Sequence, residues 1–260
     1  MDSTAEAEYF VIRGWELLPM QAEMLADYVR SAENSIGVPA GHALEIFWRF
    51  HPRFRFFKTL PAGAALLDVG ADSGALSGWK RWGDPPRGDI RLFGIDLGMG
   101  EHAGAYERWT ICDLDREFPS YDIAFDGAML AQVLCQLARP QETLAWAASA
   151  LAPGAAMYIE WQSPDAAQLP RRGELQAHNV DVVILNPSDD VANRNVFTLP
   201  EMARMIEKAG LKLIDCGQVR LGPVADALVQ EARAAADVAS VTFGLWGRLG
   251  ASLYLVAEKS

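Results

Sequence analysis

Short runs of apolar residues alternate with segments of helical spacing from about residue 63 onward. Apolar runs of this length are typical of strands buried on both faces, and the helices between them are typical of a parallel sheet covered on both sides. A long connection precedes the final run, which suggests an antiparallel pair at the edge of the sheet. We predict strands at 64–69, 90–96, 107–112, 125–130, 154–160, 211–219 and 253–257.

Helical spacing and capping residues predict the remaining elements. Thr198, followed by Pro200 and Glu201, is typical of a capping box and predicts a helix that ends at Gly210. Pro52 is expected to end a helix that begins at Ala43. Helical spacing alone predicts further helices over 20–32, 132–137, 141–151 and 224–236. The expected organisation is a helical N-terminal segment, residues 1–60, and one α/β domain, residues 61–260, with insertions near 163–197 and 222–250.

An aromatic-rich stretch, residues 47–57, joins the N-terminal segment to the sheet. Large aromatic side chains are costly to leave in water, so this stretch either packs in the core or covers the substrate as a lid. Arg53, Arg55 and Lys58 form a local basic patch there. Its simplest interpretation is a solvated charged stretch.

The net charge argues against two classes of partner. The formal net charge of the 260 residues is −11, and nucleic acid or anionic lipid would need clustered Lys and Arg.

The three cysteines, Cys112, Cys135 and Cys216, are widely spaced in apolar surroundings, and we expect reduced core thiols and no metal site. Neither a secretory signal nor an apolar run that could span a membrane is apparent, so we expect a cytoplasmic protein. The sequence does not specify an oligomeric state.

The candidate chemistry begins at residues 64–74, where an apolar run ends in Asp68 and opens into a turn with Gly70 and Gly74. Glycine lets a backbone approach a bound ligand closely. The next strand ends at Asp96, and a carboxylate there can accept hydrogen bonds from both hydroxyls of a ribose. Asp113 follows the third strand and can accept from an adenine amino group. Ligands of open α/β sheets bind at the carboxyl ends of the strands, so these acids predict a nucleotide-like cofactor.

Four motifs, in this order, resemble class I S-adenosylmethionine-dependent methyltransferases. They are Asp68-Val69-Gly70-Ala71-Asp72-Ser73-Gly74, Gly94-Ile95-Asp96, Cys112-Asp113-Leu114 and Leu151-Ala152-Pro153-Gly154. The resemblance covers about residues 63–220, and residues 253–259 resemble the family's final strand. It implies a Rossmann-like, mostly parallel sheet with helices on both faces and an antiparallel C-terminal strand. It also implies S-adenosylmethionine as the cofactor and a small-molecule or glycan acceptor.

The resemblance assigns roles to residues by position. The ribose would contact Asp96, and Met129–Gln132 would face the methyl group. The adenine would lie between Asp113 and Leu114. The methionine end of the cofactor would contact the turn that contains Asp68, Gly70, Asp72 and Gly74.

The chain departs from the family pattern at two places. Asp72 stands where the family usually has glycine; Asp tolerates a positive φ, but its charge is expected to repel the cofactor's carboxylate. Cys135-Gln136 stands where many members carry a Glu-His pair, so any role of that pair is missing. Residues 186–193 are similar to a segment of bacterial methyltransferases that act in surface-glycan synthesis, but no histidine follows Asp189 and Asp190.

Methyl transfer from a positively charged sulfur is an in-line displacement, so the protein mainly aligns the reactants and excludes water. A hydroxyl nucleophile also needs a base. His178, Glu160 and Asp190 are the candidates, since Glu160 ends the fifth strand and the other two lie in the insertion that follows.

Two other functions fit the sequence. A nicotinamide-dependent oxidoreductase would use a similar glycine turn but needs glycine at Asp72, and an antiparallel edge strand fits it less well. A non-catalytic binding module would have a cofactor site weakened by Asp72 and an aromatic segment that contacts a partner protein.

Overall fold

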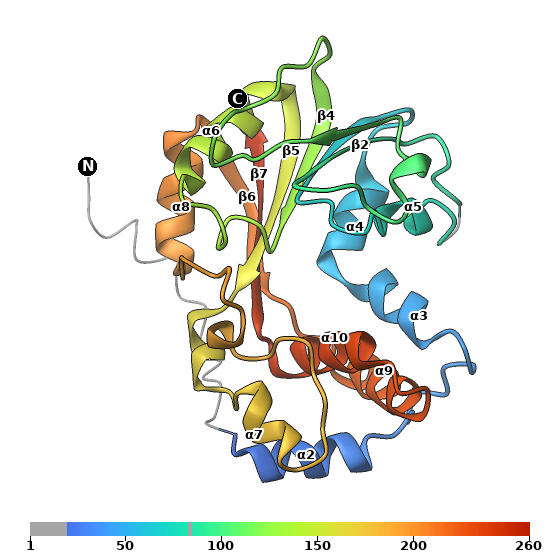
Figure 1. The fold of residues 1–260 in the computed structure, drawn as a ribbon. Coiled ribbons are helices and arrows are strands. Elements are labelled where there is room, and N and C mark those ends of the chain that lie inside the picture. Colours follow the sequence, from blue (N-terminus) through green and yellow to red (C-terminus); the bar gives the residue numbers. More distant parts are fainter. Residues whose placement is uncertain (1–19, 83–84) are drawn as a thin grey trace.

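The computed structural model describes residues 20–82 and 85–260, and residues 1–19 of the predicted N-terminal segment lie outside this range. Its centre is a seven-stranded sheet in the order β3-β2-β1-β4-β5-β7-β6 (Figure 1). Neighbouring strands are parallel except at β7, which is antiparallel to both β5 and β6. This confirms the predicted fold class. The strands are β1 (Ala65–Val69), β2 (Arg91–Asp96), β3 (Arg108–Ile111), β4 (Phe125–Ala131), β5 (Leu151–Gln162), β6 (Leu211–Gln218) and β7 (Ser252–Lys259).

Helices cover both faces of the sheet because strand side chains alternate between them. Leu67 and Val69 of β1 pack in the cluster that includes the helices α6 and α8, whereas Leu66 packs on the opposite face with residues of α3 and α4. The helices are α2 (Ala22–Ser31), α3 (Ala43–Phe50), α4 (Pro52–Thr59), α5 (Leu76–Trp79), α6 (Pro140–Ala150), α7 (Arg172–Gln176), α8 (Leu199–Lys208), α9 (Gly222–Ala234) and α10 (Val238–Leu249), with 3-10 turns η1 (Ala103–Ala105), η2 (Pro164–Gln168) and η3 (Pro187–Asp189).

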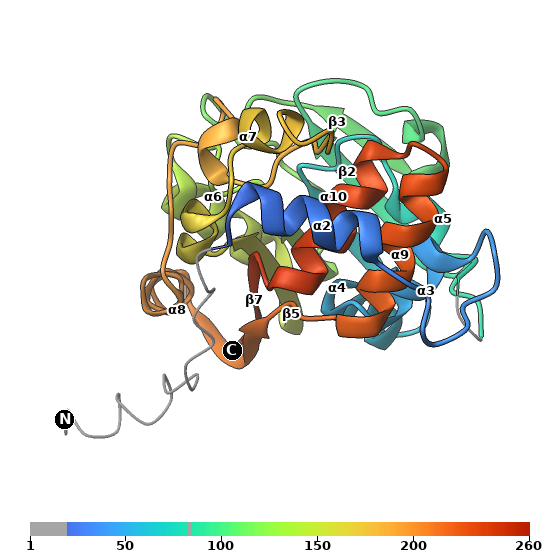
Figure 2. The same ribbon diagram turned by 90° about the horizontal axis from the view of Figure 1, so that it is seen from below.

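Three separate parts of the chain form a second layer of structure beside the carboxyl ends of the parallel strands. We call α2, residues 163–197 and residues 222–250 the cap (Figures 1 and 2). Buried side chains from all three parts form one cluster, which includes Leu25 of α2, Leu175 of α7, Val229 of α9 and Leu245 of α10. The cap therefore lies where an open α/β sheet binds its ligands.

One helix was not predicted and one predicted helix is absent. α3 ends before Pro52 as predicted, but Pro52 also begins α4, because proline fits the first turn of a helix and Nδ1 of His51 accepts a hydrogen bond from the Arg53 N–H. Residues 132–137 are not helical: Gln132 has a φ of 60°, and the carbonyl of Cys135 accepts from residues outside the segment.

The helices α8 and α10 compare differently with the predictions. The capping box at Thr198 and Glu201 is present at the start of α8. The helix α10 was not predicted, and it ends at Gly250 in the left-handed conformation.

Cys112 and Cys135 are buried free thiols, and no group of His, Cys, Asp or Glu in the described residues could hold a metal ion. None of the described helices is both long and apolar enough to cross a membrane.

Candidate functional site

The turn after β1 has the backbone conformation that its glycines predict. Gly70 and Gly74 have φ values of 72° and 82°, and Asp72 between them has a φ of 49°. A side chain at Gly70 would place its Cβ 2.9 Å from Cβ of Val133 in the segment after β4. Asp72 therefore preserves the turn, and the absence of a side chain at Gly70 lets the segment after β4 pack against it.

Asp96 and the glycine turn form one hydrogen-bonded unit. Oδ2 of Asp96 accepts from the Asp72 N–H at 2.8 Å, and Oδ1 accepts from the Leu97 N–H at 2.7 Å. Each carboxylate oxygen keeps a second lone pair for a ligand. The side chain of Asp72 is exposed, so its charge is screened by water.

Asp68 is the buried acid of this edge. Only 7% of the residue is exposed, and Oδ2 accepts a hydrogen bond from the hydroxyl of Tyr106 at 2.7 Å. Burial raises the pKa of Asp68 to about 6, although the Tyr106 hydrogen bond and the charge of Arg53 oppose the rise. Met129 pairs with Asp68 in register and is buried on the same face of the sheet.

Glu160 and Arg53 form a buried ion pair between β5 and the start of α4. Nε and Nη2 of Arg53 lie 3.1 Å and 3.0 Å from the two oxygens of Glu160. The hydroxyl of Tyr158 donates to the same carboxylate at 2.8 Å, and Nε2 of Gln132 donates at 3.3 Å. Burial alone would raise the pKa of Glu160, but the charge of Arg53 and the hydrogen bonds from Tyr158 and Arg53 outweigh burial and lower the pKa.

His51 borders this ion pair in its neutral form. Burial lowers the pKa of His51 to about 4. Because Nδ1 accepts from the Arg53 N–H, the proton is assigned to Nε2, which lies 4.0 Å from Oε2 of Glu160. Sequence reasoning missed His51 and Arg53. The expected solvated patch is wrong for Arg53, whose side chain is 17% exposed, because its partner lies 107 residues away in the chain.

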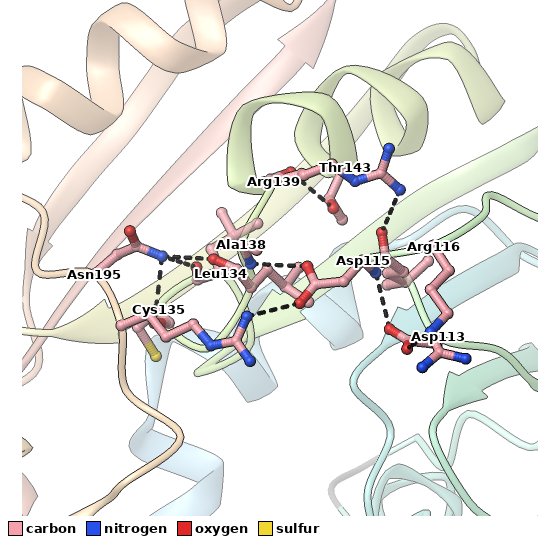
Figure 3. A network of polar contacts seen from close by, with 12 residues as sticks. Asp113, Asp115, Arg116, Leu134, Cys135, Ala138, Arg139, Thr143 and Asn195 are labelled. Carbon is pink, nitrogen blue, oxygen red and sulfur yellow. Dashed lines mark hydrogen bonds and ion pairs between the residues drawn. The ribbon is translucent and has the colours of Figure 1, made fainter.

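The Asp113 carboxylate bonds to residues that follow it in the loop after β3. Oδ1 of Asp113 accepts from the Asp115 N–H at 3.0 Å, and Oδ2 pairs with Nε of Arg116 at 3.0 Å (Figure 3). The side chain of Leu114 is buried in the core cluster on the side of α6 and α8. We call the ends of β1, β2 and β3, with Asp68, Asp96 and Asp113, the aspartate side of the edge.

The segment after β4 is held by the end of the first insertion (Figure 3). The Asn195 side chain donates to the carbonyl of Leu137 at 2.6 Å, and the backbone N–H groups of Arg194 and Asn195 both donate to the carbonyl of Cys135. Asp115 joins the same parts, since it accepts from the Ala138 N–H at 2.8 Å and from Nη1 of Arg194 at 3.0 Å. These bonds replace the helix expected over 132–137.

Of the other two candidate bases, Asp190 contacts the segment after β4, and His178 does not. Oδ2 of Asp190 accepts from Nε2 of Gln136 at 3.2 Å. His178 lies at the end of α7, where its backbone carbonyl accepts from Arg30 of α2. Within the described residues, no hydrogen bond or ion pair joins the His178 side chain to Glu160 or Asp190, and its catalytic role stays a prediction.

Comparison with protein families decides the kind of protein. A family model described as a methyltransferase domain matches residues 47–215, from α3 to β6. The chain belongs to this family. The match confirms the resemblance stated from the motifs, and it favours a methyltransferase over both the nicotinamide-dependent oxidoreductase and the binding module. No curated protein matches the sequence.

Solved structures with similar folds include methyltransferases and one enzyme with another named activity. The methyltransferase partner in a Haloferax volcanii Trm112 complex has a TM-score of 0.55 at 18% identity, with 91% of this chain and 97% of that chain covered. The [4+2]-cyclase SpnF has a TM-score of 0.53 at 18% identity, with 91% and 94% covered. A Burkholderia thailandensis 1,6-didemethyltoxoflavin N1-methyltransferase has a TM-score of 0.50 at 18% identity, with 92% and 88% covered. These likenesses show the fold.

The aspartate side of this methyltransferase fits the cofactor that its family implies, S-adenosylmethionine. The Asp96 carboxylate, bonded to the glycine turn, offers lone pairs at the position expected for a ribose. Leu97, Met99 and Ile111 are exposed apolar side chains next to it: the first two follow Asp96 in the chain, and Ile111 pairs with it in register. An exposed apolar group beside a polar cluster is typical of a ligand site and can cover a flat base.

Proposed function

We propose that this methyltransferase transfers the methyl group of S-adenosylmethionine to an oxygen of a small-molecule or glycan acceptor. The observation that carries the proposal is the hydrogen bond between Asp96 and the Asp72 N–H, which joins the acid expected to bind the ribose to the glycine turn. When bound, the cofactor supplies a methyl group on a positively charged sulfur. Asp68, Asp96 and the turn would hold it, and the cap would exclude water from the reaction.

The acceptor follows from charge and from the residues beside the segment after β4. A net charge of −11 disfavours nucleic acid as substrate. A hydroxyl acceptor must lose its proton, and Asp190, bonded to Gln136, is the better placed of the predicted bases. Glu160 is less suited, because both of its oxygens already accept hydrogen bonds and its pKa is lowered.

Calorimetric titration tests cofactor binding directly. We expect the wild-type chain to bind S-adenosylhomocysteine in preference to NAD, and Asp96→Ala to weaken that binding about 10-fold or more, since a hydrogen bond to a charged group contributes about 1.5–3 kcal/mol. Asp122→Ala, at an exposed aspartate before β4, is the matched control and should bind normally. Preference for NAD, or equal affinities in wild type and Asp96→Ala, would contradict the proposal.

The atom that is methylated needs a second measurement. Trideuteromethyl-labelled S-adenosylmethionine would be incubated with sugars, other hydroxyl compounds and matched amines, and the products analysed by mass spectrometry. We expect the label on oxygen. Transfer to amines alone would overturn the choice of oxygen and leave the cofactor assignment intact.

A further inference from the structure

The last residue of β5, Gln162, has a buried amide nitrogen that no group in the described part of the chain accepts from. Gln162 is only 6% exposed. A buried donor without a partner loses its hydrogen bond to water and gains none in return, so such groups are rare in folded proteins and indicate that a ligand or a water completes the site.

The orientation of this amide follows from its neighbour. Nδ2 of Asn193 donates to the carbonyl of Pro187 at 3.1 Å, and a carbonyl can only accept, so this atom is the nitrogen. The same Nδ2 lies 3.0 Å from Oε1 of Gln162. Gln162 must therefore present its oxygen to Asn193, which leaves the two N–H groups of Nε2 as the unpaired donors.

Gln162 is linked through Ser252 to Gln132, one of the residues expected to face the methyl group. It pairs in register with Ser252 and shares a sheet face with Glu160, two residues earlier. Nε2 of Gln132 donates both to Glu160, at 3.3 Å, and to Oγ of Ser252, at 3.2 Å. We call Gln132, Gln136, Gln162 and Asn193 the amide cluster. Gln132 and Gln136 follow β4, Gln162 ends β5, and Asn193 lies in the insertion after β5. The strands β4 and β5 lie on the other side of β1 from β2 and β3.

We propose that Nε2 of Gln162 donates a hydrogen bond to an uncharged oxygen of the methyl acceptor, such as a hydroxyl, ether or carbonyl oxygen. The inference rests on the proposed function, because that function assigns the aspartate side to the cofactor and the region of Gln132 to the acceptor. Charge restricts the acceptor further. Arg53 is already paired with Glu160, so it offers no free positive charge to a buried anionic group, and an ammonium group has no lone pair for Nε2.

Three probes of one shape separate these possibilities. Benzamide, benzoate and benzamidine differ in charge, and only the first two offer an oxygen. Their binding to the full chain, with S-adenosylhomocysteine bound, would be measured by calorimetry for wild type, Gln162→Met and Gln162→Glu. Gln162→Met removes the donor and also the contact with Asn193, whereas Gln162→Glu keeps an oxygen for Asn193. Gln176→Met, at an exposed glutamine of α7, is the control.

We expect wild type and the control to bind benzamide more tightly than the other two probes, and both Gln162 variants to bind it at least 5-fold more weakly with an unchanged affinity for S-adenosylhomocysteine. Equal benzamide binding in the variants, no benzamide binding by wild type, or preference for benzamidine would overturn the inference alone. Absence of S-adenosylhomocysteine binding by wild type would instead contradict the proposed function. A crystal structure with a water on Nε2 that benzamide does not displace would assign the amide to structural hydration and also overturn the inference.

Discussion

The two halves of the ligand-binding edge differ in chemistry although they belong to one sheet. The ends of β1 to β3 present carboxylates, whereas the ends of β4 and β5 carry the amide cluster, and the carboxylate near the end of β5, that of Glu160, is paired with Arg53. Carboxylates suit hydroxyls and cations, and amides suit uncharged groups that both accept and donate. Under the proposed function, this difference places the cofactor and the acceptor on parts of one edge with different chemistry. Arg53 lies at the border, because it binds Glu160 and its charge also acts on Asp68.

The largest effect on stability is expected from removing the ion pair between Arg53 and Glu160. Arg53→Met leaves the Glu160 carboxylate buried without its cation, which should lower the free energy of unfolding by about 3–5 kcal/mol. Urea unfolding measures the loss, with Arg55→Met, at an exposed arginine, as the control. The double variant Arg53→Met/Glu160→Leu should recover much of it. A single variant as stable as wild type would show that the ion pair does not join the two halves.

The aspartate side should have its own pH dependence. The pKa of Asp68 is raised to about 6 in the folded state, so this carboxyl stabilises the fold most at low pH and loses that contribution as pH rises from about 4 to 6. Asp68→Asn keeps an acceptor for Tyr106 and removes the titration. Between pH 4 and pH 6, the wild type should therefore lose up to about 3 kcal/mol more unfolding free energy than the variant. Urea unfolding at several pH values measures it. Identical pH profiles for wild type and variant would place the pKa of Asp68 near its ordinary value.

The contact between the halves depends on the bonds that hold the segment after β4. Asn195→Ala removes the donor to the Leu137 carbonyl and should cost about 1 kcal/mol, since the interaction is between neutral groups. Because Val133 of the same segment packs on Gly70, binding of S-adenosylhomocysteine should also weaken several-fold. Calorimetry and urea unfolding give the two values. Asn34→Ala, which loses a bond to Val38 far from this segment, should lose stability without losing affinity, and equal effects in both variants would refute the coupling.

The smallest effect is expected at Asp72. Asp72→Gly keeps the N–H that Asp96 accepts from and removes one exposed charge, so S-adenosylhomocysteine affinity should rise about 2–5-fold, in line with the small energies of exposed charges. Calorimetry at low and high salt measures the change, which should shrink as salt rises. A decrease in affinity would show that the Asp72 carboxylate itself contacts the cofactor.

Local patterns were enough to predict the sheet and the aspartate side. Buried strands and glycine turns depend on residues close in sequence, and Asp68, Gly70 and Asp96 could therefore be placed at one edge before any contact was known. The segment 132–137 could not be predicted, because Asn195, some sixty residues later, takes its carbonyls. Arg53 was misjudged for the same reason. Its burial follows from Glu160 and not from the charges around it in the sequence.

The position of β7 has a consequence for how the polypeptide matures on the ribosome. Among the described strands, β6 pairs only with β7, which is synthesised after it and after α9 and α10. A nascent chain that has just completed β6 therefore carries a strand with no partner and an open flank on β5. When β7 inserts between β5 and β6, it pairs with both strands at once. We therefore expect this half of the sheet to reach its native topology only after β7 has been synthesised.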